Sequence, residues 1–98
     1  MILYNVTINV DESINDEWLE WMKSRHIPDV LATGMFTGYK IFRIRTDDEG
    51  FTYSIQYFLK SDEDYEKYQK DFAPKLQAEH TEKFKNKFVA FRTVMELC

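Results

Sequence analysis

Two histidines are the residues of this sequence best suited to proton transfer. His26 ends a run of residues with helical periodicity and is followed by Pro28 and Gly34. An imidazole has a pKa of about 6.5, so a histidine at the mouth of a cleft could act as an acid or a base. A histidine in the last turn of a helix would instead interact favourably with the helix dipole. His26 is therefore the candidate catalytic residue, with helix termination as the alternative.

The large aromatic side chains could line a pocket for a flat or apolar ligand. Small-molecule sites combine apolar and aromatic walls with a few polar groups. The alternative for each residue is a place in the core, where tyrosine hydroxyls would need a hydrogen-bond partner, a pocket or ordered water. The candidate ligand-binding residues are Trp18, Trp21, Tyr4, Tyr53, Tyr57 and His80.

The remaining polar residues give weaker signals. Arg43, Arg45 and Arg92 could form salt bridges across a dimer or hold an anion. The two histidines could meet Asp29 or Glu79 at a metal, but they lack the HxH or HExxH spacing of known metal sites. The sequence also lacks a phosphate-binding glycine loop and a nucleophile with an evident base. We expect neither a metal nor another cofactor.

The elements that must position these residues follow from hydrophobic periodicity. Ser13 and Ser61 are the expected helix N-caps. Pro28 should end the first helix near His26, a short second helical turn over "PDVLAT" should follow and stop at Gly34, and Pro74 should kink or split the second helix. Alternation with a period of two predicts strands, and apolar spacing of three or four residues predicts helices. The strands are predicted at residues 2–10, 39–45, 51–59 and 87–97, and the helices at residues 13–26 and from 61 to about 84.

The order βαββαβ in 98 residues predicts a single α+β domain over residues 1–98 with a ferredoxin-like fold. This fold has a four-stranded antiparallel sheet with two helices on one face. We expect the two helices to run parallel to each other, which would bring His26 and His80 to the same edge of the sheet.

The residues of the last strand should alternate between the helix-covered face of the sheet and the second face, which no helix covers. We expect Val89, Phe91 and Met95 to face the helices, and Ala90 and Arg92 to lie on the second face. The second face would also carry hydroxyl and amide side chains from the other strands, with aromatic side chains among them. A sheet face of this kind is a candidate for pairing with a second copy of the chain, so we expect a homodimer.

The tract "RHIPDVLATGMFTG", together with the βαββαβ order, resembles the dimeric α+β barrel superfamily, in which two ferredoxin-like sheets close face to face. It is similar to small proteins related to muconolactone isomerase, to antibiotic-biosynthesis monooxygenases and to YCII-type proteins, and the histidine of the YCII-type tract falls on His26. From "MILYNVT" through "FAPKL" to "KFVAFRT", the chain resembles the bacterial family named domain of unknown function 4286. This resemblance implies a fold without an activity.

Composition limits the partners and the compartment. The formal charge is −4 and no Lys/Arg cluster is present, so we do not expect nucleic acid as a partner. No apolar run approaches the roughly 18 to 20 residues of a membrane span, and the N-terminal residues read as a strand rather than a signal peptide. The single cysteine, Cys98, suits a reducing compartment, so we expect a cytoplasmic protein.

Two classes of function remain open from the sequence. The first is a non-catalytic homodimer that binds a small aromatic or apolar metabolite between helices and sheet, or a partner protein. The second is a cofactor-free monooxygenase or isomerase of the barrel superfamily, with His26 as acid or base and Trp18 and Tyr53 shaping the pocket. The fold does not decide between them, because this architecture hosts many activities.

Overall fold

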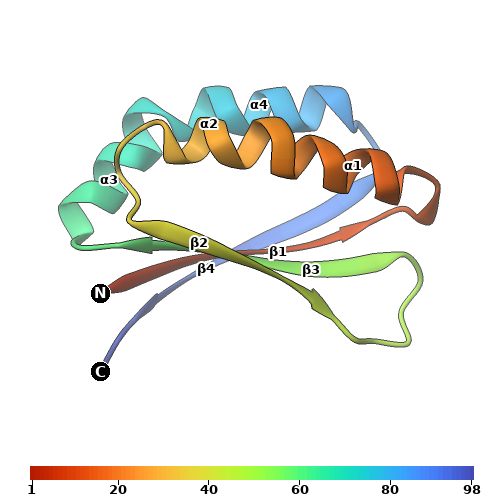
Figure 1. The fold of residues 1–98 in the computed structure, drawn as a ribbon, viewed down its shortest axis with the longest axis horizontal. Helices are drawn as coiled ribbons and strands as arrows, with labels where there is room; N and C mark the ends of the chain where they lie inside the picture. Colours follow the sequence, from red (N-terminus) through yellow and green to blue (C-terminus); the bar gives the residue numbers. More distant parts are fainter.

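A computed structural model describes residues 1–98 and contains a four-stranded antiparallel sheet whose helices all lie on one face (Figure 1). The strands occur in the order β2-β3-β1-β4, which is the ferredoxin-like arrangement. The predicted fold class is confirmed. The strands are β1 (Ile2–Val10), β2 (Gly38–Ile44), β3 (Phe51–Leu59) and β4 (Phe88–Glu96).

The helical layer consists of two rods. The first is continuous and changes its helical type three times along its length. The second is interrupted at Phe72, where the backbone leaves helical geometry just before Pro74, as predicted. The first rod contains η1 (Glu12–Ile14), α1 (Asn15–Trp21), η2 (Met22–His26) and α2 (Ile27–Leu31), and the second contains α3 (Asp62–Asp71) and α4 (Ala73–Lys83). None of these helices is both long enough and apolar enough to cross a membrane.

The prediction that the first helix ends near His26 is wrong. The rod continues through Pro28 because residues 22–26 form a π-helical turn, in which the Ile27 N–H donates to the carbonyl of Met22. A proline inside a regular α-helix lacks its N–H donor and clashes with the carbonyl four residues before it. The wider π turn, a form often found at functional sites, lets the helix pass the proline. His26 therefore lies inside a helix rather than at its end.

The helix starts were predicted with mixed success. Ser61 caps α3 by accepting a hydrogen bond from the Asp64 N–H, as expected. Ser13 does not cap the first rod. Asp11 takes this role, because its carboxylate accepts a 2.9 Å hydrogen bond from the Ser13 N–H.

The two helical rods run antiparallel, which corrects the expectation that they run parallel. The central strands β1 and β3 are antiparallel, and each helical rod runs in the opposite direction to the strand that precedes it (Figure 1). The two rods are therefore antiparallel to each other. His26 and His80 still meet, because α1 and η2 of the first rod pass beside α4 and not because both histidines lie at the same edge.

The register of β4 is also opposite to the one expected. Arg92 pairs with Val6 and Ala90 pairs with Ile8, so both side chains share the helix-covered face of the sheet. Val89 and Phe91 lie on the other face and are 70% and 63% exposed. Because side chains alternate along a strand, an error of one position moves every residue to the other face.

Candidate functional site

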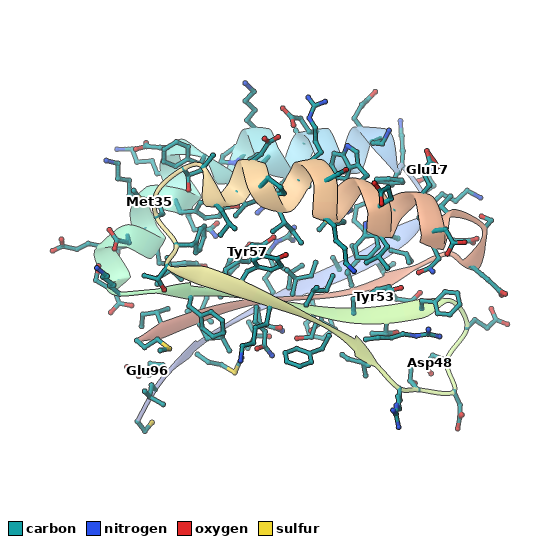
Figure 2. The ribbon with its side chains drawn as sticks, in the orientation of Figure 1. Glu17, Met35, Asp48, Tyr53, Tyr57 and Glu96 are labelled. Atoms are coloured by element: carbon teal, nitrogen blue, oxygen red, sulfur yellow. The ribbon has the colours of Figure 1, made fainter.

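A small cavity lies between the helical layer and the sheet, and residues from every strand except β2 line it. Its volume is about 40 Å³. Tyr57, one of its lining residues, lies between the helices and the sheet (Figure 2). The lining residues are Tyr4, Val6, Ile8, Met22, His26, Val30, Ile55, Tyr57, Tyr68, Gln77, His80, Phe88, Ala90 and Arg92. We call this space the histidine cavity.

The π-helical turn places His26 at the histidine cavity. The imidazole is partly buried, and the Trp21 ring stacks on it with centroids 5.1 Å apart and an interplanar angle of 28°. Its Nδ1 is buried and has no hydrogen-bond partner. Buried polar atoms of native proteins usually have a partner, so a free imidazole nitrogen is available to a bound molecule.

His80 reaches the same cavity from α4 and is held in one tautomer. The Trp18 indole N–H donates a 2.9 Å hydrogen bond to Nε2 of His80 in a fully buried environment. In a neutral imidazole the nitrogen that accepts carries no proton, so the proton lies on Nδ1. The His80 ring contacts Phe88 edge to face at 4.4 Å and lies 5.7 Å from the His26 ring.

Both imidazoles are neutral at physiological pH. Burial lowers the pKa of His26 from 6.5 to about 4; the Asp29 carboxylate opposes this shift and the Arg92 guanidinium adds to it. Burial also lowers the pKa of His80 to about 4, with further lowering by His26 and Arg92. A neutral imidazole can accept a proton, and the lowered pKa makes His26 a weaker base than a free imidazole.

Tyrosine hydroxyls supply further polar groups. Tyr4, Tyr57 and Tyr68 line the histidine cavity, and none of their hydroxyls forms a hydrogen bond to another residue. Burial raises the pKa of Tyr57 and of Tyr68, so both phenols stay protonated and can donate. The cavity therefore combines an apolar wall with several free donors.

The candidate residues divide into two groups by position. Tyr4, Tyr57, His26 and His80 line the cavity. Trp18, Trp21 and Tyr53 do not. Trp18 and Trp21 instead contact the histidines that line the cavity: Trp18 donates a hydrogen bond to His80, and Trp21 stacks on His26.

Tyr53 has a structural contact of its own. Its hydroxyl donates a 2.6 Å hydrogen bond to the Asn15 side chain at the start of α1, and its ring packs 4.9 Å from Trp18. This bond ties β3 to the first rod and satisfies the hydroxyl.

Ten of the fourteen lining residues were not among the candidate catalytic or ligand-binding residues, and four of these ten, Tyr68, Arg92, Met22 and Gln77, have polar or flexible side chains. Tyr68 lies on the apolar stripe of the second rod, so its position was visible in the periodicity. Arg92 was named as a residue that could form a salt bridge or hold an anion, but it was assigned to the wrong face because the register of β4 was reversed. Met22 and Gln77 carry no sequence signal that separates them from other helix residues.

Two other features bear on where the site lies. A larger hollow of about 740 Å³ opens to solvent beside the β2–β3 hairpin, but no histidine or tyrosine lines it. Its charged, open surroundings lack the apolar walls of a small-molecule site. No group of three or more His, Cys, Asp or Glu side chains is arranged to hold a metal ion.

The family model described as Domain of unknown function (DUF4286) matches residues 1–98. The chain belongs to this family. The resemblance seen in the sequence is therefore confirmed. A comparison of this DUF4286 chain with curated proteins gives no match.

Solved structures similar to this DUF4286 chain share its fold. A variant of MhuD with two manganese protoporphyrin IX molecules bound per active site has a TM-score of 0.71 at 18% identity, covering 99% of this chain and 94% of that one. A variant of SnoaB, a cofactor-independent oxygenase from Streptomyces nogalater, has a TM-score of 0.69 at 11% identity, with coverages of 98% and 92%. A dimeric ferredoxin-like protein from an uncultured marine organism has a TM-score of 0.69 at 17% identity, with coverages of 99% and 94%.

Proposed function

We propose that this DUF4286 chain is a homodimeric protein that binds a small molecule in the histidine cavity. The observation that carries the proposal is the convergence of unpaired polar groups on one buried space. The free Nδ1 of His26 and the hydroxyls of Tyr4, Tyr57 and Tyr68 have no partner in the chain. Of these atoms Nδ1 of His26 is fully buried, and a ligand that hydrogen-bonds to it removes a penalty of about 1 to 3 kcal/mol.

The size of the cavity limits how the ligand enters. A space of about 40 Å³ holds a few atoms, whereas pockets that enclose a whole drug-sized molecule measure about 300 to 1,000 Å³. Either a small polar group of the ligand enters, or side chains such as Met22 and Gln77 move aside. Both residues lie on helices and have flexible side chains.

Native mass spectrometry of the protein isolated from its own host tests this proposal. We expect the mass of a dimer plus a bound small molecule. Ala90→Leu fills the cavity, so the added mass should disappear while the dimer remains. Ala78→Leu, on the exposed surface of α4, is the matched control, because it adds the same side chain outside the cavity and away from the sheet. Absence of any bound molecule in the natural protein, or its retention in Ala90→Leu, contradicts the proposal.

Dimerisation is proposed from the sheet surface that no helix covers, which we call the open face. Side chains project from this surface without a covering layer (Figure 2). Exposed apolar residues lie on both edge strands of it, around a central group of hydrogen-bonded Asn5, Thr7 and Ser54. The apolar residues are Phe42, Ile44, Val89, Phe91 and Met95, each between 39% and 70% exposed. Exposed apolar area of this kind marks an interaction surface.

A second copy is the proposed occupant of the open face, because one structure of the same fold is described as a dimeric ferredoxin-like protein. Light scattering after size exclusion should give twice the 11.8 kDa mass of one chain. Phe91→Lys should reduce the mass to one chain, and Glu66→Lys, on the exposed surface of α3, should leave it unchanged. A monomeric natural protein contradicts this part of the proposal. We also place the protein in the cytoplasm, since its single cysteine suits a reducing compartment.

A second candidate function is favoured by His26. Its neutral imidazole with a free, buried Nδ1 could remove a proton from a bound acidic C–H or O–H group. SnoaB, which shares the fold, is described as a cofactor-independent oxygenase. In D₂O the natural protein should then catalyse deuterium exchange into the ligand identified by mass spectrometry, and His26→Gln should bind that ligand without exchange. Equal exchange by both proteins contradicts a catalytic role for His26.

A further inference from the structure

Arg92 is the only charged residue that lines the histidine cavity, and no carboxylate pairs with it. Arg92 lies on the edge strand β4, where it pairs with Val6 of the central strand β1, and its side chain lines the cavity while remaining exposed to solvent. The one salt bridge in the chain joins Arg25 to Asp29 at 3.7 Å on the helix surface. Arg92 lies on the covered face, so a partner docked on the open face would not neutralise it.

The other polar groups of the cavity are also suited to a negative charge. The chain has 17 acidic residues against 13 basic ones, yet no Asp or Glu lines the cavity. His80 presents its Nδ1 proton because Nε2 accepts from Trp18, and the phenols of Tyr57 and Tyr68 remain protonated. Each of these groups can donate a hydrogen bond to an anionic oxygen.

We propose that the ligand of the histidine cavity binds as an anion, through a carboxylate or a deprotonated hydroxyl that pairs with Arg92. This inference rests on the proposed binding function and names the chemical class of its ligand. Arginine and neutral donors form charge-assisted hydrogen bonds to such an oxygen. The volume of about 40 Å³ admits an acidic group of this size, while the apolar remainder of the ligand extends past the exposed Arg92 side chain.

The same arrangement disfavours neutral and cationic ligands. A cation would meet the Arg92 charge with no acidic residue in the cavity to compensate it. A neutral amide of the same shape would lose the ion pair with Arg92. The site therefore selects by charge as well as by shape.

Two matched pairs of probes test the inference: acetate with acetamide, and benzoate with benzamide. Binding is followed at constant ionic strength by the NMR shifts of the His26 and His80 ring protons. In the natural protein we expect at least one acid to bind 10-fold or more tightly than its amide. Arg92→Gln should abolish that preference, and Arg92→Lys should retain part of it.

Arg43→Gln is the control, because Arg43 also lies on the covered face but contacts Phe51, 4.3 Å from its ring centre, and does not line the cavity. It should leave the preference intact. Equal affinity for acid and amide, or a preference that survives in Arg92→Gln, overturns the anionic ligand class and leaves the binding function standing. Failure of all four probes to shift either histidine overturns both.

Discussion

The indole of Trp18 donates a 2.9 Å hydrogen bond to Nε2 of His80, across 62 positions of sequence. This bond joins the first helical rod to α4 and directs the remaining N–H of the imidazole away from the indole. A tryptophan that does not line the cavity thus determines which hydrogen-bonding group His80 offers there.

Replacement of Trp18 by Phe should destabilise the fold and allow His80 to populate both neutral tautomers. We expect a loss of about 2 to 4 kcal/mol in the free energy of unfolding, from the unpaired buried nitrogen and the lost volume. Urea unfolding measures the loss, and ¹⁵N NMR of the imidazole reports the tautomer. Trp21→Phe, which removes no hydrogen bond to His80, should preserve the tautomer. A His80 spectrum unchanged in Trp18→Phe would refute this positioning role.

Stability should fall as the pH drops from about 6.5 towards 4. The folded-state pKa values of His26 and His80 are lowered to about 4, so in this window the unfolded state binds more protons than the folded state. The slope is up to about 1.4 kcal/mol per pH unit for each histidine, and it vanishes above the unfolded pKa. Urea unfolding at pH 7.5, 6 and 5 checks it. His26→Gln should show a shallower slope, and a pH-independent natural protein would contradict the burial of both rings.

The register of β4 can be tested with two phenylalanines. Phe88→Ala should lower the free energy of unfolding by about 2 to 3 kcal/mol, because this half-buried ring packs 4.4 Å from His80. Phe91→Ala, which trims a ring that is 63% exposed, should cost less than about 0.5 kcal/mol in the isolated chain. The measurement is made at protein concentrations low enough to keep the chain monomeric. The reverse order of effects would mean that β4 is shifted by one residue.

Gly50, in the β2–β3 turn, should not tolerate a side chain. Its φ angle is +76°, and a Cβ there would lie 2.4 Å from the carbonyl oxygen of Val10. Gly50→Ala should therefore cost more than the roughly 1 to 2 kcal/mol of positive-φ strain alone. Gly34 has a φ of +79° with nothing near its Cβ position, so Gly34→Ala isolates the strain. Thermal unfolding compares the two variants, and equal losses would contradict the close approach to Val10.

The sequence by itself determined the order of the elements and the contents of most of the core. Alternation over residues 2–10 and 51–59 predicted the first and last residues of β1 and β3 correctly. Both strands direct the predicted apolar side chains toward the core. The break before Pro74 and the cap at Ser61 were predictable because both depend on local backbone chemistry. Tyr4, Tyr57, His26 and His80 were recognised as candidates by residue type.

Only the tertiary structure decided how these residues meet. β4 carries apolar residues on both faces, so alternation could not fix its register, and Arg92 was placed on the wrong side. The π turn at His26 carries the rod past Pro28, against the preference of the residue before a proline for extended geometry. The pairing of Trp18 with His80 joins distant positions, and no local pattern encodes such a contact. The site is therefore a product of packing, whereas the fold follows from periodicity.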